Sequence, residues 1–529
     1  MEAAAISAEV AEAEAVGDKG LKKNSIGFLD GLAIGLDSTA PAYSLAAVIG
    51  SIVVIAGVQA PAVLLVSFIP MFFIAAAFYY LNKVDQDCGT TFSWVTRTLG
   101  PSAGWIGGWA IFTTGILVIG SLADVSAYYI YDLFGLDGLR DSRTAVILLA
   151  LVIIAVMTTI CVIGTELSAR VQRVMAFAQI GALLLFVVVA AFDLIAGDGG
   201  PRSIDPSLSW LNPFEIENFS EQLIPGVLLG VFIYWGWESA VNLTEESEDS
   251  SRAPGLAGIV STITLLGTYV GVTYCLIAYA GLDKIGRFDD DAGVLGAVGE
   301  DVLGGLSFLL VLSIIISGIA SAQTTILPGS RTSLSMAVAG AFPKRFAEIH
   351  PRYLTPAFGT ILIGVVATIW YVGASAVSDN FLFDSLSALS LLIAFYYALT
   401  GVACAIYYRH ELLRSVRNLV FVGIAPLIGA GALAYLLYES ILQLADPADS
   451  YSGTAVLGIG VPLAIALFFF IAGIVGLIAW RFTGGTEFFR RKAFEAVPRD
   501  VIDGGGRVEA IGLSESDADA GKTDLDGKG

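Results

Sequence analysis

The sequence predicts an all-α polytopic membrane protein, and two observations carry that prediction. Of the 529 residues, 56% are hydrophobic and only 14% are charged, whereas a soluble domain is about half apolar and a quarter charged. The apolar residues also fall in long blocks, each near the roughly 20 residues that a helix needs to span a bilayer. A membrane β-barrel would instead show alternating segments of about ten residues, which this sequence lacks.

About twelve transmembrane helices are expected. Their predicted ranges are 27–54, 59–82, 104–134, 143–165, 169–196, 222–246, 255–282, 303–327, 355–375, 381–408, 418–442 and 454–481. An even number of spans places both chain ends on the same side of the membrane.

Basic residues in the connections indicate which side that is, because short cytoplasmic connections carry the excess of Lys and Arg. The connections on the same side as the two chain ends carry Lys83, Arg97, Arg170, Arg173, Arg252, Arg331, Lys344, Arg345, Arg352, Arg409, Arg414 and Arg417. The other side has only Arg140, Arg143, Arg202, Lys284 and Arg287. The prediction is a multi-pass protein of the plasma membrane with both termini in the cytoplasm.

Two polar tails flank the spans. Residues 1–25 are rich in Ala and Glu and are expected to form a disordered cytoplasmic tail rather than a cleavable signal peptide. Residues 26–410 hold the first ten helices and residues 411–482 the last two. Residues 483–529 form a cytoplasmic tail that is acidic and Gly-rich beyond Arg499 and is expected to be disordered.

Composition also excludes several classes of function. The formal net charge of −20 argues against a nucleic-acid partner, which requires basic patches. The four cysteines share no metal-ligand spacing, and both histidines lie in polar connections, so no metal and no cofactor are expected. The phosphate-binding loop of an ATPase, G-x-x-x-x-G-K-[S/T], is absent from the sequence.

The first span is interrupted near its middle. Gly27–Leu45 reads G-F-L-D-G-L-A-I-G-L-D-S-T-A-P-A-Y-S-L. Pro41 lacks an N–H and clashes with the preceding helical turn, while Ser38 and Thr39 offer the backbone alternative hydrogen bonds. The carboxylate of Asp37 stands beside the predicted break.

The sixth span repeats this pattern. Phe232–Glu238 reads F-I-Y-W-G-W-E, and a carboxylate at membrane depth usually faces protein or water and marks a functional site. Two interrupted helices five spans apart predict a 5+5 inverted repeat, with two helices added and a solute site between the breaks.

The two breaks together suit the head group of an α-amino acid. An interrupted helix exposes N–H groups at one half-helix start and C=O groups at the other half-helix end, and these favour an anion and a cation respectively. The predicted carboxylate contacts are the backbone of Ser38, Thr39, Ala40 and Pro41. The predicted ammonium contacts are the carbonyls of Phe232, Ile233, Tyr234 and Trp235. The alternative is that both breaks are ordinary kinks in a packed bundle.

These residues resemble the amino acid–polyamine–organocation permease family. The strongest element is Y-W-G-W-E-S-A at Tyr234–Ala240, followed by E-E and then R-A-P. The A-P-A-Y-S of the first span and the G-P…G-W…G-G-W at Gly100–Trp109 agree with it. The resemblance implies a LeuT-like fold and secondary active transport by alternating access. It also makes Phe232 a candidate gating aromatic and Glu238 a candidate coupling residue. The aromatic run itself makes Trp237 a further gating candidate. The alternatives are core packing for the aromatics and a structural role for the carboxylate.

The chain departs from the family where coupling is concerned. Gln179 stands where some proton-coupled relatives carry a lysine, and a glutamine does not exchange a proton in the working range. Asp37, Asp124 and Glu238 are the intramembrane acids that could carry the proton instead, and no basic residue is expected to pair with them. Alternatively, Na⁺ could bind hydroxyls of the eighth span, where Ser317 and Ser321 belong to a stripe that otherwise suits close helix packing.

The expected function is therefore import or exchange of amino acids or related amines, coupled to H⁺ or Na⁺. The acids favour cationic solutes, whereas the aromatic and Ala-rich surroundings suit neutral ones. A polyamine or organic-cation importer stays open as an alternative, as do an intramembrane aspartyl-type enzyme and a channel. The lipid bilayer and a small-molecule substrate are the expected partners, and oligomeric state is left open.

Overall fold

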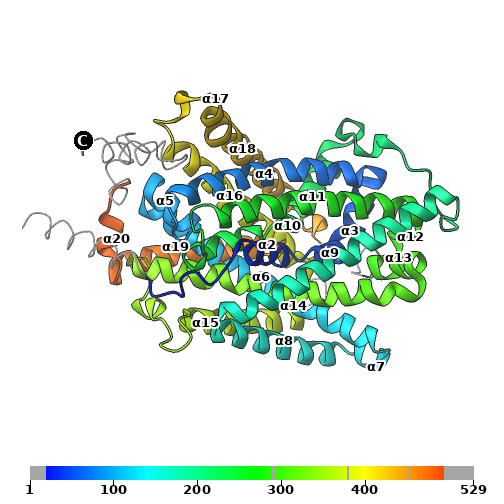
Figure 1. Ribbon diagram of the computed structural model, residues 1–529, viewed down its shortest axis with the longest axis horizontal. Helices are drawn as coiled ribbons and strands as arrows, with labels where there is room; N and C mark the ends of the chain where they lie inside the picture. The colour runs from blue at the N-terminus through cyan, green and yellow to red at the C-terminus, as the bar shows by residue number, and fades with distance from the viewer. Residues whose placement is uncertain (1–18, 289–292, 378–380, 451, 494–529) are drawn as a thin grey trace, which may run out of the picture.

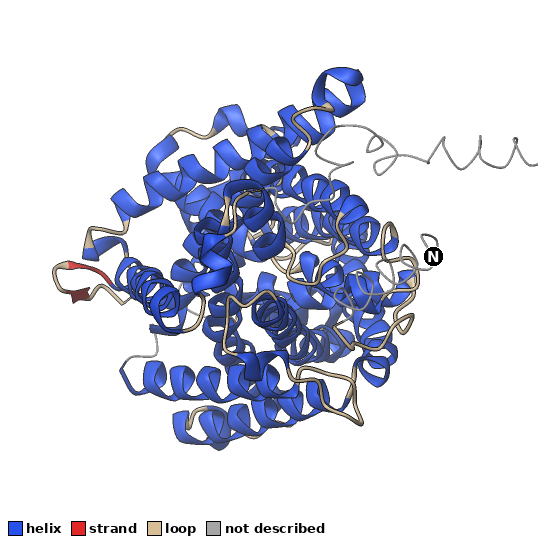
Figure 2. Ribbon diagram, turned by 90° about the vertical axis from the view of Figure 1, so that its left-hand side faces the viewer, coloured by secondary structure: helices blue, strands red, loops and turns tan. Residues whose placement is uncertain are grey.

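The computed structural model describes residues 19–288, 293–377, 381–450 and 452–493. Within these residues the long helices run side by side in a single bundle (Figure 1). Viewed end-on, the bundle is rounded, with helices inside a surrounding layer of others (Figure 2). One small antiparallel sheet joins β1 (Ala455–Val456) to β2 (Ile459–Gly460), with Ala455 opposite Gly460. The chain is an all-α polytopic membrane protein, as predicted.

Eleven helical stretches in the described part of the chain are long and apolar enough to cross a membrane. The first, Phe28–Val84, has 57 residues and would measure about 85 Å as one helix, far more than the roughly 30 Å of a bilayer's hydrocarbon core. It reverses at η1 (Gly57–Gln59), where Gly57 has a φ of +58°. This stretch therefore makes two crossings, which gives the predicted twelve.

The crossing helices follow the predicted order. They are α2 (Phe28–Thr39) with α3 (Pro41–Ala56), α4 (Ala60–Val84), α6 (Pro101–Leu133), α8 (Arg143–Ile163), α9 (Thr165–Ala196), α10 (Ile224–Ile233) with η5 (Trp237–Glu246), α11 (Ala253–Ala280), α14 (Ser307–Val338), α15 (Ala357–Val377), α16 (Phe381–Tyr407), α18 (Ala425–Gln443) and α19 (Val461–Thr483).

Shorter helical elements connect the crossings. They are α5 (Thr91–Leu99), α7 (Asp137–Arg140), η2 (Leu208–Leu211), η3 (Pro213–Glu215), η4 (Phe219–Leu223), α12 (Leu282–Ile285), η6 (Gly286–Phe288), α13 (Val294–Leu303), η7 (Gly304–Leu306), η8 (Lys344–Ala347), η9 (Leu412–Arg414), α17 (Val416–Asn418), η10 (Leu419–Ile424), η11 (Pro447–Asp449) and α20 (Thr486–Arg490).

Some predicted boundaries differ from the structure. Helix α14 continues through Pro328 to Val338 instead of ending at 327, and its polar C-terminal half is buried by neighbouring elements. Residues 19–25, predicted as tail, lie against the core: the Ser25 N–H donates to the Glu246 carbonyl at 2.8 Å. Part of the predicted C-terminal tail forms α20, whose Phe488 is buried. Residues 1–18 and 494–529 of the predicted tails lie outside the described residues.

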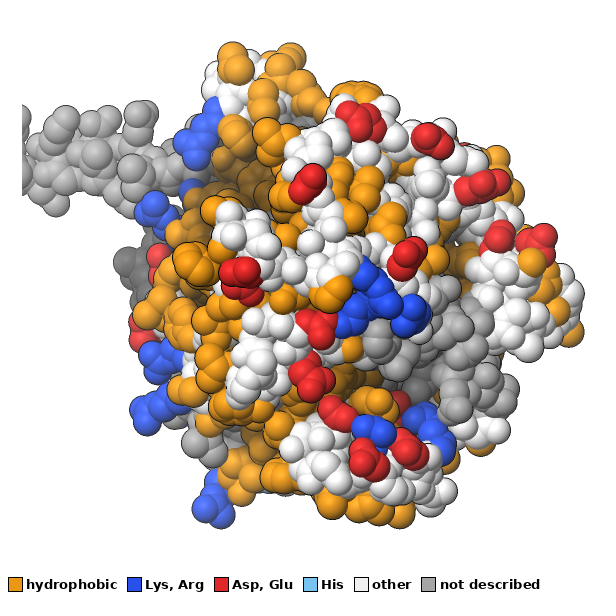
Figure 3. Space-filling model, turned by 90° about the vertical axis from the view of Figure 1, so that its right-hand side faces the viewer, with side chains coloured by type: hydrophobic (Ala, Val, Ile, Leu, Met, Phe, Trp, Pro, Cys, Tyr) orange, Lys and Arg blue, Asp and Glu red, His pale blue; other side chains and the backbone are white. Residues whose placement is uncertain are grey.

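The bundle has two ends with different charge. The segment that begins at Lys19 lies at the same end as α5 and α20, and we call this end the N-terminal face (Figure 1). Helices α7, α12 and α13 lie at the other end, the opposite face. Acidic side chains are spread across the opposite face among apolar and uncharged ones, with groups of basic side chains between them (Figure 3).

The first crossing is broken where the sequence predicted. Helix α2 ends at Thr39, and Ala40 has φ 49° and ψ 61°, a left-handed conformation that non-glycine residues seldom adopt. Pro41 then occupies the first position of α3, where its fixed φ suits a helix start and its missing N–H removes no helical hydrogen bond.

The sixth crossing is broken at Gly236. Helix α10 ends at Ile233, and Gly236 has φ +121° and ψ −23° before the 3₁₀ helix η5 begins. The two breaks touch each other, because Ser38 Oγ lies 2.6 Å from Ser239 Oγ. A Cβ atom on Gly236 would lie 2.6 Å from the Ser38 carbonyl oxygen and 2.9 Å from the Thr39 nitrogen. Only glycine permits both this backbone conformation and this approach.

Replacing Gly236 with alanine should therefore separate the two breaks. We expect backbone strain alone to lower the free energy of unfolding of the G236A variant by about 1–3 kcal/mol. Its thermal unfolding temperature in detergent should fall as a result. The matched control is G267A, since Gly267 lies in α11 and a Cβ atom added to it would meet nothing within 4 Å. An unfolding temperature for G236A equal to that of G267A would contradict the contact between the breaks.

Candidate functional site

Hydroxyl groups from neighbouring helices satisfy the carbonyls at both breaks. Ser321 Oγ of α14 donates to the Ser38 carbonyl at 2.9 Å, and Ser44 Oγ donates to the Thr39 carbonyl at 2.7 Å. At the other break, Tyr269 Oη of α11 donates to the Ile233 carbonyl at 2.8 Å. A carbonyl oxygen has two lone pairs, so each of these groups keeps a second position at which it can accept.

The structure thus places Ser38, Thr39 and Ile233 at the two breaks, and supplies partners that the sequence did not identify. Neither Tyr269 nor Ser239 was singled out by sequence. The sequence feature that could have identified them is a hydroxyl side chain in an otherwise apolar span. Many residues with a purely structural role have the same feature.

The predicted sodium residues lie at the first break. Ser317 Oγ accepts the Tyr43 N–H at 3.2 Å, so it caps the start of α3. Ser321 Oγ contacts the Ser38 carbonyl and lies 3.4 Å from Thr325 Oγ1. These groups form an oxygen-rich region between α14 and the break, in which hydrogen bonds join the two elements.

Glu238 fixes the second break to α16. Its Oε1 accepts the Tyr396 hydroxyl at 2.5 Å, and its Oε2 accepts the Tyr397 hydroxyl at 2.5 Å and the Gly236 N–H at 3.1 Å. Tyr396 Oη in turn accepts a hydrogen bond from Trp235 Nε1. A carboxylate at the start of η5 also complements the positive end of the helix dipole. Its geometry is that of a positioning residue.

Asp37 and Gln179 form a second polar pair beside the first break. Gln179 Nε2 of α9 donates to Asp37 Oδ1 of α2, and both side chains are fully buried. Among the described residues, Asp37 Oδ2 and Gln179 Oε1 have no hydrogen-bond partner. Buried polar atoms are nearly always paired, and these two oxygens are among the exceptions in the described part of the chain.

Asp124 is paired, and the expectation that no basic residue meets the intramembrane acids was wrong. Arg143 Nη1, at the start of α8, lies 2.6 Å from Asp124 Oδ1, and the Tyr371 hydroxyl donates to the same oxygen at 2.5 Å. Arg331 also lies within a crossing helix, α14, rather than in a connection, and forms a fully buried ion pair with Glu246.

The aromatic side chains of the second break are buried in the bundle. Trp237 packs edge-on against Phe78 of α4, with ring centroids 5.1 Å apart, and also against Tyr397. Tyr234 packs on Tyr269, with centroids 5.2 Å apart. Phe232 is buried in the same hydrophobic cluster. The surroundings of Tyr234 and Trp237 are those of core packing residues.

Comparison with known proteins identifies the family and the fold. The family model of amino acid permeases matches residues 35–459. The crystal structure of MhsT in complex with L-phenylalanine superposes with a TM-score of 0.55, covering 77% of this chain and 98% of that chain at 14% identity. This likeness shows the LeuT-like fold.

Curated relatives extend the match over most of the chain. The methylthioribose transporter of Bacillus subtilis (strain 168) is 25% identical over 387 residues, which cover 69% of this chain and 77% of that protein. The low-affinity putrescine importer PlaP of Escherichia coli (strain K12) is 22% identical over 386 residues, covering 71% and 80%. The branched-chain amino acid permease BcaP of Lactococcus lactis subsp. cremoris (strain MG1363) is 24% identical over 351 residues, covering 62% and 70%.

These relatives are transporters, so the alternative of an intramembrane aspartyl-type enzyme is wrong. The family match spans both helix breaks and the helices that hold them, and it agrees with the fold. The chain belongs to the amino acid permease family, within the amino acid–polyamine–organocation superfamily.

Proposed function

We propose that this permease carries an α-amino acid across the plasma membrane by alternating access, and that the solute binds where its two broken helices meet. The observation that carries the proposal is the direct contact between the breaks, through Ser38 and Ser239. There the end of α10 and the start of α3 present carbonyl and N–H groups. Discontinuous helices place such groups at the substrate site of transporters with this organisation.

The state of Asp124 and Glu238 favours a zwitterionic or neutral solute. Asp124 is neutralised by Arg143, and Glu238 is engaged by two tyrosines and a backbone N–H. Both carboxylates therefore already bind protein groups, so their presence does not favour a cationic solute. A polyamine or other organic cation is the runner-up, supported by the similarity to a putrescine importer.

We assign the N-terminal face to the cytoplasm, with both termini on that side. Support comes from the basic residues of its connections, including Lys83, Arg97 and Arg345, and from the positive-inside rule. The acidic side chains of the opposite face agree with an external location (Figure 3).

Asp37 is our candidate for the residue that carries a coupling proton. Among the described residues, one of its buried carboxylate oxygens has no hydrogen-bond partner, and neither does the amide oxygen of Gln179, whose amide nitrogen donates to Asp37. A buried charge without a partner is energetically costly. Protonation of Asp37 would remove such a charge. The oxygen groups near Ser317 and Ser321 are the alternative, as ligands of Na⁺.

Purified protein in proteoliposomes should accumulate labelled amino acid without chemical change.

A thermal-shift screen against the amino acids and polyamines should identify the solute first, because a ligand present at about 100 times its Kd stabilises the folded state by about 2.7 kcal/mol. Stabilisation by putrescine, with none by any amino acid, would favour the runner-up.

The D37N variant should transport with a flat pH profile. The amide can keep the contact with Gln179 but cannot release a proton. D124N serves as the contrast: it should lose stability, because it breaks the pair with Arg143, while its residual transport keeps the parent pH profile. A flat profile in D124N with an unchanged one in D37N would transfer the role to Asp124. Loss of transport on replacing Na⁺ with choline would point to Ser317 and Ser321.

The contact between Glu238 and Tyr396 should be measurable by a double-mutant cycle. We expect E238Q and Y396F to show a coupling of about 1.5–3 kcal/mol in stability, the range for a hydrogen bond to a charged group. Y438F is the control, since Tyr438 is exposed. Additive effects of E238Q and Y396F would mean that the two side chains do not hold the break in solution.

A further inference from the structure

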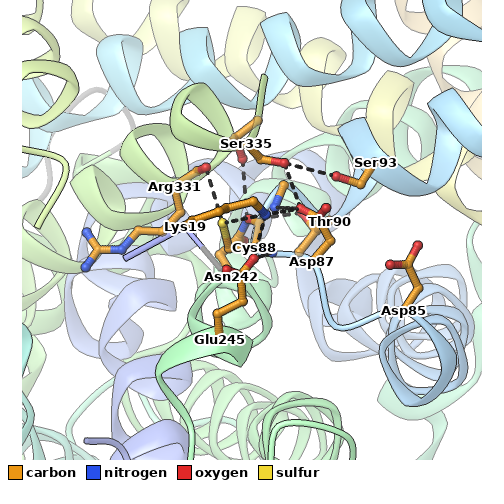
Figure 4. Close-up of polar contacts among 12 residues, drawn as sticks. Lys19, Asp85, Asp87, Cys88, Thr90, Ser93, Asn242, Glu245, Arg331 and Ser335 are labelled. Carbon is orange, nitrogen blue, oxygen red and sulfur yellow. Dashed lines mark hydrogen bonds and ion pairs between the residues drawn. The ribbon is translucent and has the colours of Figure 1, made fainter. Parts of the chain in front are cut away.

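The side chain of Lys19 is inserted into the N-terminal face. Its Nζ atom lies 2.6 Å from Glu245 Oε1, 2.9 Å from Asp87 Oδ1 and 3.6 Å from Cys88 Sγ. Figure 4 shows the lysine lying between Asp87 and Glu245. The side chain is only 7% exposed. Three separate parts of the chain therefore meet at one ammonium group: the segment before α2, the connection after α4, and the end of η5.

Each carboxylate of this cluster is bound to a different part of the bundle. Asp87 Oδ1 accepts the Ser335 hydroxyl of α14 at 2.7 Å and the Gly89 N–H at 2.8 Å. Glu245 Oε1 belongs to η5, the second half of the broken sixth crossing, and accepts the Cys88 N–H at 2.9 Å. Lys19 thus joins the broken crossing to α14.

Electrostatics favour the ionised forms of Lys19 and Asp87. Burial alone would lower the pKa of Lys19, but attraction to Asp87, Cys88 and Glu245 outweighs it and raises that pKa above its ordinary value. Burial would likewise raise the pKa of Asp87, yet the ammonium and the hydrogen bonds from Lys19, Ser335 and Gly89 lower it to about 2. The ion pair between Lys19 and Asp87 is therefore complete at neutral pH.

The backbone of the same segment is tied to the broken sixth crossing. The N–H groups of Ser25 and Ile26 both donate to the Glu246 carbonyl, at 2.8 and 3.1 Å, and the Glu248 N–H donates to the Ile26 carbonyl at 3.0 Å. Glu246 itself holds the buried Arg331 of α14. The adjacent glutamates Glu245 and Glu246 thus each bind one cation at this face.

We propose that Lys19–Ile26 is a latch that closes the cytoplasmic end of the solute pathway, and that Lys19 must leave Asp87 and Glu245 for this end to open. The proposal rests on alternating access by the proposed transporter. The latch precedes α2 directly and contacts η5, so it joins one half of each broken crossing to α14 and the connection after α4. Opening these elements toward the cytoplasm separates the ammonium from its carboxylates, which water then solvates.

The native cysteines provide a direct test, because all four are buried. One protein retains Cys88 alone, with the other three changed to serine. A second has all four changed and carries T332C; Thr332 is buried on α14, one turn closer to the breaks than Ser335. A polar maleimide is added to the purified protein, and the labelling rate is measured with K19Q, with K19R, or with K22Q.

We expect K19Q to accelerate labelling of both Cys88 and T332C by about tenfold or more, within the usual range of coupling between sites. Both cysteines should be labelled more slowly in K19R than in K19Q, because arginine keeps the positive charge at position 19. K22Q should match the parent, since Lys22 is exposed on the same segment. The E245Q variant removes the charge of one carboxylate partner of Lys19 and should also accelerate labelling of T332C. It replaces K19Q in the test if K19Q fails to fold.

Two results would overturn the latch. Unchanged rates in K19Q and E245Q would show that the contact does not close the pathway. Acceleration of Cys88 without T332C would show that Lys19 merely covers the thiol. Neither measurement needs a solute. Failure of the wild type to transport would therefore contradict the proposed function alone, and normal transport with unchanged labelling would contradict the latch alone.

Discussion

The need to pair every backbone polar group within the bilayer shapes this protein more than any other constraint. Lipid offers no hydrogen bonds, yet two crossings are interrupted and expose N–H and C=O groups. The structure meets that need with hydroxyls from α14 and α11 and with the Glu238 carboxylate. The helices around the breaks are thereby joined to them by hydrogen bonds.

This constraint also explains why the breaks are so closely packed. Gly236 allows the Ser38 backbone to approach, and Ser239 then joins it through a hydroxyl pair. Each break uses the other as a neighbour that excludes lipid. In the proposed function, a solute that enters between them would replace contacts the protein already makes, so binding would be an exchange of partners rather than the filling of an empty space.

The sequence predicted features that depend on local chemistry and missed those that depend on distant partners. Pro41 and Gly236 marked the breaks because their backbone preferences are intrinsic. The end of α14 was missed because Ser330–Ser333 reads as a polar connection, although Glu246 and other distant groups bury it. The pairing of Asp124 with Arg143, and the ordered residues 19–25, likewise depend on contacts between elements that hydropathy does not register.

The acid-rich opposite face affects more than topology. Fixed negative charge attracts mobile cations, protons included, and its field extends about 8 Å at physiological ionic strength. At low ionic strength the local proton concentration at this face is therefore higher than in the surrounding solution. Added salt removes that difference, so in the proposed orientation the apparent pH at which the outer entrance operates would depend on the ionic strength of its medium.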